Sequence, residues 1–130
     1  MSFTTAALAL AFSLVVQAAP AQVPPAQGDW RPLGTSGGGR QTSYDAASIT
    51  RAGPVTRVRL RFIEGQSYAL GTIELRCAAY EARSMGTVTY DPNGVELNRN
   101  DMATPFRAII AGTILETVRA EVCGAAPGRQ

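Results

Sequence analysis

The middle of the chain alternates between two kinds of side chain with a period of two residues. The stretch PVTRVRLRFI occupies positions 54–63. One face of it carries Thr56, Val58, Leu60 and Phe62, and the other carries Arg57, Arg59 and Arg61. This alternation is typical of an antiparallel strand that has one face in the core and one in water.

The next stretch, SYALGTIELRC at 67–77, repeats the alternation. It places Ile73, Leu75 and Cys77 on the inward face and Glu74 and Arg76 on the outward face. Cys77 is therefore expected at the end of the buried face of a strand.

Further strands are predicted on both sides of this pair. Trp30 and Leu33 suit a first strand and 40–44 a second, and the glycine-rich TSGGGR between them makes a hairpin turn. The glycines lack the lysine and following helix of a phosphate-binding loop. A fifth strand is predicted over 81–90, a turn at DPNG (91–94) and a short sixth strand at 95–97.

The connection after the second strand carries its own turn signal. Asp45 is followed three residues later by Ser48, which predicts a turn held by side-chain hydrogen bonds. Ile49 then supplies an apolar side chain for the core.

The C-terminal stretch changes to the period of a helix. Leu115, Val118 and Val122 form an apolar stripe with Ile114 beside it, while Glu116, Arg119 and Glu121 are expected to face water. Thr113 and Glu116 have the spacing of a capping box, and Gly124 is a stop signal. The predicted fold class is thus α+β: a single antiparallel sheet of about five to six strands, packed by a short C-terminal helix.

The N-terminal residues predict export. Residues 6–16 form an unbroken run of small and apolar side chains, followed by small residues suited to signal-peptide cleavage after Ala21. We expect a signal peptide at 1–21, a linker at 22–28, one domain at 29–124 and a tail at 125–130. The run is too short to span a bilayer, so no transmembrane segment is predicted. The absence of a cysteine near the cleavage site argues against a lipid anchor.

Export determines the expected state of the cysteines. In an oxidising compartment, two cysteines in a small domain most often pair, so Cys77 and Cys123 are predicted to form a disulfide. The bond would close a loop of about 46 residues and contribute ~4 kcal/mol of stability. Without histidine a two-cysteine zinc site is disfavoured, and the separation is not that of a redox motif.

Composition narrows the chemistry further. The chain has neither histidine nor lysine, and its twelve basic residues are all arginine. It therefore lacks an imidazole base and a lysine nucleophile, and we predict no enzymatic activity, no metal site and no cofactor. The net charge of +2 is too small to argue for nucleic-acid binding.

The row Arg57, Arg59 and Arg61 is the candidate site. Three guanidiniums ~7 Å apart on an exposed face suit an anionic ligand. The alternative is a solvated sheet face that cross-strand carboxylates such as Glu74 balance. The four tyrosines offer either a binding surface or packing residues.

Several motifs together resemble the surface-adhesin protein E family of exported bacterial domains. They are WRPLG (30–34), YDAASITRAGPV (44–55), ELRC (74–77), YDPNG (90–94) and PFRAIIAGTILETVRAEVC (105–123). The resemblance covers about Trp30 to Cys123. It implies an antiparallel sheet packed by a C-terminal helix, with the two cysteines bonded, and adhesion to host matrix and serum proteins.

Two functions follow as expectations. The first is an exported, non-enzymatic, adhesin-like binding module that engages a protein or an anionic polysaccharide. The second is a periplasmic structural or envelope-assembly protein without an adhesive role.

Overall fold

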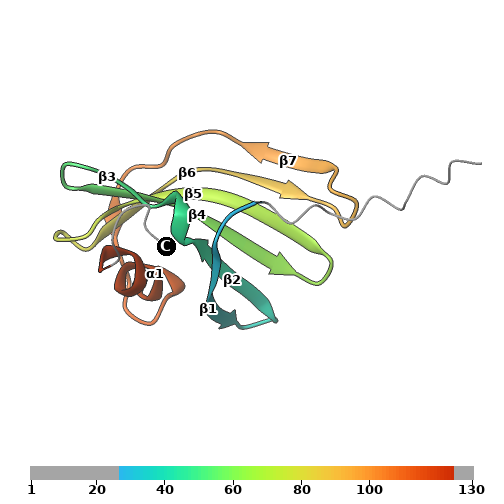
Figure 1. Ribbon diagram of the computed structural model, residues 1–130, viewed down its shortest axis with the longest axis horizontal. Helices are drawn as coiled ribbons and strands as arrows, with labels where there is room; N and C mark the ends of the chain where they lie inside the picture. The colour runs from blue at the N-terminus through green and yellow to red at the C-terminus, as the bar shows by residue number, and fades with distance from the viewer. Residues whose placement is uncertain (1–26, 125–130) are drawn as a thin grey trace, which may run out of the picture.

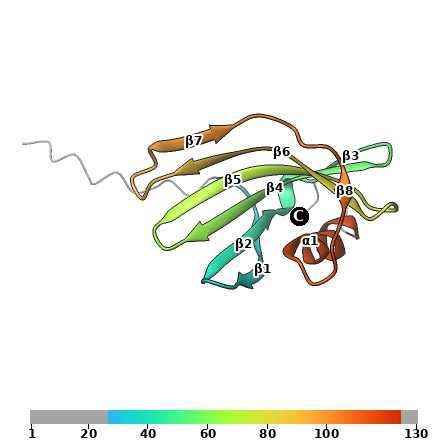
Figure 2. The same cartoon turned by 180° about the vertical axis from the view of Figure 1, so that it is seen from behind.

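The computed structural model describes residues 27–124, which form one antiparallel sheet and one α-helix (Figures 1 and 2). The strands are β1 (Trp30–Ser36), β2 (Arg40–Asp45), β3 (Thr50–Ala52), β4 (Val55–Glu64), β5 (Ser67–Arg76), β6 (Glu81–Tyr90), β7 (Glu96–Asn100) and β8 (Arg107–Ala108). The helix α1 spans Ile114–Cys123, and a 3-10 turn spans Ala46–Ser48. The predicted signal peptide and tail, and most of the linker, lie outside the described residues.

The main path of the sheet follows the chain almost in order. Its strands run β1-β2-β4-β5-β6-β7, with β3 paired to β4 and β8 paired to β6. All pairings are antiparallel, and β4 and β5 are joined over their whole length, from Val55 opposite Arg76 to Glu64 opposite Ser67. The predicted class, a β-rich sheet with one C-terminal helix, is confirmed.

The predicted strand number is wrong, because the sheet has eight strands rather than five to six. The strands that the pattern missed are β3, with three residues, and β8, with two. Alternation can be recognised only over about four residues or more. These two short strands are therefore defined only by their pairing with β4 and β6. The sixth predicted strand also begins later, at Glu96 rather than Val95.

The core lies between the inner face of the sheet and α1. Val58, Leu60 and Leu75 are fully buried on the inner face, as are Val118 and Val122 on the helix. Both the alternation of β4 and the apolar stripe of α1 are confirmed. Figures 1 and 2 show α1 lying against one side of the curved sheet, next to β8.

The predicted disulfide is present and ties α1 to the end of β5. Cys77 and Cys123 are bonded, with their Cα atoms 5.8 Å apart. Arg119 was expected to face water, but its Nε and Nη2 donate to the Cys77 carbonyl at 3.1 and 2.9 Å. The helix end is therefore joined to the sheet by a covalent bond and a charged hydrogen bond together.

The start of α1 departs from the predicted capping box. Thr113 is the N-cap residue, but its hydroxyl donates to the Ile110 carbonyl at 2.6 Å and caps no helical amide. The Glu116 carboxylate accepts from the Gly112 amide at 2.6 Å, one residue before the N-cap. Gly124 does follow the last helical residue, but with φ of −88°, so the left-handed conformation is not needed there.

The turn after β2 forms as predicted. The Asp45 carboxylate accepts from the Ala47 amide at 3.1 Å, and the Ser48 hydroxyl donates to the Asp45 carbonyl at 2.7 Å. Ile49 is 1% exposed and belongs to the core. Asp45 itself ends β2, and its side chain lies on the face of the sheet opposite the helix, beside Arg59.

Candidate functional site: the outer face of the sheet

The sheet face opposite α1, here called the outer face, carries the predicted arginine row. Arg57 lies opposite Glu74 on β5, Arg59 opposite Thr72, and Arg61 opposite Leu70. Residues paired across antiparallel strands share a face, so the row is on one surface as predicted. The structure adds that the three guanidiniums have different partners.

Arg57 belongs to a charged network with a central carboxylate. Glu74 accepts from Arg57 Nη2 at 3.1 Å and from Arg83 Nη2 at 2.6 Å, so it sits between two guanidiniums from neighbouring strands. Glu74 was expected to face water, but it is 7% exposed because the long arginine side chains cover it. Burial favours its neutral form, yet the hydrogen bonds from Arg83 and Arg57 outweigh burial and lower the pKa of Glu74.

Arg59 is paired with a second buried carboxylate, Asp45. Arg59 Nη2 donates to Asp45 Oδ2 at 2.7 Å, while the amides of Asp29 and Ala47 donate to Oδ1 at 2.8 and 3.1 Å. Arg59 Nη2 also donates to the Gln27 carbonyl at 2.6 Å. Burial of Asp45 opposes its charge, but the Arg59 and amide hydrogen bonds prevail and lower the pKa of Asp45.

Arg61 differs from its two neighbours because no carboxylate within residues 27–124 pairs with it. Its guanidinium lies over the Trp30 ring, 4.6 Å from the centroid, and Arg59 lies over the same ring at 5.4 Å. Arg61 Nε is buried with no hydrogen-bond partner among the described residues, and burial lowers the pKa of Arg61. Of the three arginines, Arg61 keeps the least compensated charge.

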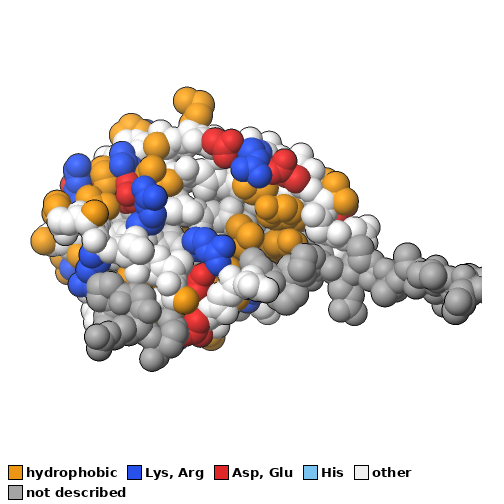
Figure 3. Space-filling model, turned by 45° about the horizontal axis from the view of Figure 1, so that its top comes forward, with side chains coloured by type: hydrophobic (Ala, Val, Ile, Leu, Met, Phe, Trp, Pro, Cys, Tyr) orange, Lys and Arg blue, Asp and Glu red, His pale blue; other side chains and the backbone are white. Residues whose placement is uncertain are grey.

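Next to Arg61 the outer face becomes apolar. Strand register places Ile63 opposite Tyr68 and Tyr68 opposite Tyr90, and Leu70 opposite Val88. These five half-buried residues form what we call the outer patch. The Tyr68 and Tyr90 rings stack with centroids 4.8 Å apart. Figure 3 shows hydrophobic side chains gathered beside basic and acidic ones on this side of the molecule.

A second aromatic contact lies at the other end of the outer face. Phe106 has the guanidiniums of Arg76 and Arg83 over its ring, at 3.8 and 4.5 Å from the centroid. The outer face thus combines arginine with aromatic rings at both ends, around the buried carboxylates of Asp45 and Glu74.

Sequence reasoning located the arginine row but missed Trp30 and Asp45 as its neighbours. Trp30 lies opposite Asp45 in the β1–β2 pairing, which brings both beside Arg59. A strand partner of this kind is set by register between separate segments, and no local pattern at either residue indicates it.

The described residues contain no cluster of histidine, cysteine, aspartate or glutamate that could hold a metal ion. Within that same range, no helix is long and apolar enough to cross a membrane.

The chain was compared with protein-family models, with curated proteins and with solved structures. None of the three comparisons finds a match.

Proposed function

We propose that this chain is an exported, non-enzymatic binding module that engages a protein partner through the outer face, in the manner of an adhesin. The composition of that face carries the proposal: Arg61, whose guanidinium lies over Trp30, borders an apolar patch that includes the stacked Tyr68 and Tyr90. Arginine, tryptophan and tyrosine are the residues most enriched at the energetic centres of protein interfaces.

The pairing of the arginines favours a protein over an anionic polysaccharide. Glu74 and Asp45 neutralise Arg57 and Arg59, so the row attracts a polyanion less strongly than three uncompensated guanidiniums would. An apolar patch beside the row adds nothing to polyanion binding but contributes directly to a protein interface. The motifs shared with surface-adhesin protein E domains support partners among host matrix and serum proteins.

The test measures binding of the purified protein to immobilised extracellular-matrix glycoproteins by surface plasmon resonance, with heparin as a competitor. We expect saturable binding that the double variant Leu70→Ser, Val88→Ser weakens at least ~10-fold, because it removes the apolar pair of the patch next to Arg61. Met102→Ser is the matched control, since Met102 is 77% exposed and lies outside the patch. Circular dichroism melts establish that all the variants are folded.

Three results would count against the proposal. One is the absence of binding to any matrix glycoprotein, which would favour the periplasmic structural role. Another is equal binding by the patch variant and the wild type. The third is complete competition by heparin together with loss of binding in the single variant Arg61→Gln. That result would indicate that the ligand is an anionic polysaccharide rather than a protein.

A further inference from the structure

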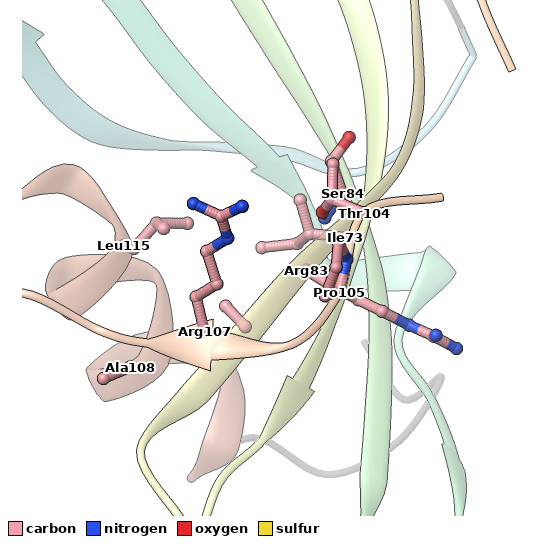
Figure 4. A pocket seen from close by; sticks show the side chains of 9 residues that line it. Ile73, Arg83, Ser84, Thr104, Pro105, Arg107, Ala108 and Leu115 are labelled. Atoms are coloured by element: carbon pink, nitrogen blue, oxygen red, sulfur yellow. The ribbon is translucent and has the colours of Figure 1, made fainter. Parts of the chain in front are cut away.

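A cleft with a cavity volume of ≈ 240 Å³ lies on the inner side of the sheet, where β8 and the segment before it run along β6 next to the start of α1. Its apolar wall includes Ile73, Ala82 and Leu115. We call it the β8 cleft, and Figure 4 shows it from close by. Arg83 borders the cleft, but its guanidinium is turned away and bonds Glu74 on the outer face.

Arg107 is the unusual member of this cleft. It comes from β8, opposite Ala82, and its guanidinium extends between Leu115 and Ile73 in the view of Figure 4. The side chains of the other arginines of residues 27–124 each make a hydrogen bond, an ion pair or a ring contact, whereas the exposed side chain of Arg107 makes none of these with that part of the chain. A guanidinium without a partner can form two parallel hydrogen bonds with a carboxylate, and the apolar wall beside it can contact the rest of such a ligand.

Two hydroxyls add polar groups to the same cleft. Ser84 Oγ accepts from the Gly86 amide at 3.2 Å, and Thr104 Oγ1 accepts from the Ser84 amide at 3.0 Å. A hydroxyl that accepts a hydrogen bond still has its own proton to donate. In Figure 4 both residues lie across the cleft from Arg107, so the apolar wall has hydrogen-bonding groups on two sides.

We propose that the β8 cleft binds a short aliphatic monocarboxylate, with the carboxylate paired to Arg107 and the hydrocarbon chain against Ile73, Ala82 and Leu115. The volume limits the ligand, because a water molecule occupies ~30 Å³ of liquid and the cleft therefore holds on the order of eight non-hydrogen atoms. A chain of about six carbons with its carboxylate has this size. The chain of a long fatty acid would extend beyond the cleft.

The probe is hexanoate, added to ¹⁵N-labelled protein and followed by NMR. We expect saturable shifts at the amides of 104–108 and Leu115, with a dissociation constant of about a millimolar or lower, since so small a ligand has few contacts to offer. Arg107→Gln should weaken binding at least ~10-fold because it removes the charged fork. Its melting temperature should match the wild type, since the exposed Arg107 side chain makes no hydrogen bond, ion pair or ring contact within residues 27–124.

The controls separate the contribution of the ligand's charge from that of its apolar chain, and the effect of Arg107 from that of another arginine. Hexanamide has the same chain without the charge, and should bind much more weakly than hexanoate. Arg40→Gln, which removes another exposed arginine far from the cleft, should bind hexanoate like the wild type. N-acetyl-leucine tests whether the same site takes the C-terminal residue of a peptide, and its binding should depend on Arg107 in the same way.

Equal affinity for hexanoate and hexanamide would overturn the proposal, as would unchanged binding in Arg107→Gln. Shifts confined to the outer face would also overturn it. The β8 cleft and the outer patch lie on opposite faces, so a negative result at one leaves the proposal for the other intact.

Discussion

At the scale of single residues, the two buried carboxylates of the outer face, Asp45 and Glu74, join separate segments of the chain through their hydrogen bonds. Asp45 accepts hydrogen bonds from two backbone amides and from Arg59, and its side chain is 3% exposed. A Cβ added to Gly28 would come within 2.6 Å of this carboxylate, so the chain entering β1 also depends on it. Asp45 thus joins the start of the domain to β4.

We expect Asp45→Asn to lower the free energy of unfolding by about 2 kcal/mol, because asparagine keeps an acceptor for the amides but loses the charged bond to Arg59. The folded pKa of Asp45 is lowered, so its stabilising effect is present above the ordinary carboxyl range and is lost as pH falls through the folded value. The difference between variant and wild type should therefore shrink on acidification. Urea unfolding at ~pH 7 and ~pH 3 measures it.

Glu121→Gln is the control for this experiment, since Glu121 is exposed on α1. It should change stability by less than ~0.5 kcal/mol at either pH. A penalty for Asp45→Asn that is equal at both pH values would show that the charge of Asp45 does not stabilise the fold.

At the scale of elements, contacts with the sheet stabilise α1 more than its own backbone hydrogen bonds do. A helix of ten residues is marginal alone in water, and two of its residues, Val118 and Val122, are fully buried against the sheet. The disulfide and the bonds from Arg119 to the Cys77 carbonyl hold the helix end at β5. Arg51 adds a bond from β3 to the Cys123 carbonyl at 3.1 Å.

Replacing Cys77 and Cys123 by serine should cost ~4 kcal/mol, because the open chain regains the entropy of a loop of 46 residues. The effect should be largest in α1, whose amides should exchange with solvent much faster than those of β4 and β5. Hydrogen exchange followed by mass spectrometry measures this by segment. Unchanged protection of 114–123 in the double variant would show that apolar packing alone holds the helix.

At the scale of the whole molecule, the two proposed sites divide the surface between the faces of one sheet. The outer face presents arginines and the outer patch, while α1 packs against part of the inner face and the β8 cleft opens beside the helix. Figures 1 and 2 show that the helix covers part of the sheet only. One face of a single curved sheet therefore packs in the core, and the other carries the proposed recognition surface.

Export and oxidation can be tested on the intact protein. When it is expressed with its own N-terminus in a Gram-negative host and recovered from the periplasm, we expect its first residue near Gln22, after a signal peptide of residues 1–21. Its mass should be lower than that of the reduced chain by the two thiol hydrogens, as the Cys77–Cys123 bond requires. Intact-mass spectrometry measures both. A chain that retains Met1 would contradict export.

Local periodicity alone determined the strands β4 and β5, the helix α1 and the inward face of the apolar residues that alternate with arginine and glutamate. Alternation is read from a residue and its near neighbours, so Val58, Leu60 and Leu75 were assigned to the core correctly. The disulfide followed from the number of cysteines and the predicted compartment. The arginine row followed from the same alternation, which placed Arg57, Arg59 and Arg61 on one surface.

Tertiary structure alone decided what surrounds those arginines. The pairing of β1, β2, β4 and β5 brings Asp45, Glu74 and Trp30 next to them. Glu74, which was expected to face water, is buried under the guanidiniums of Arg57 and Arg83. The short strands β3 and β8, and with β8 the cleft at Arg107, exist only because longer strands offer them free hydrogen-bonding edges. These features depend on the strand register between distant segments, and no local sequence pattern indicates the energy of that pairing.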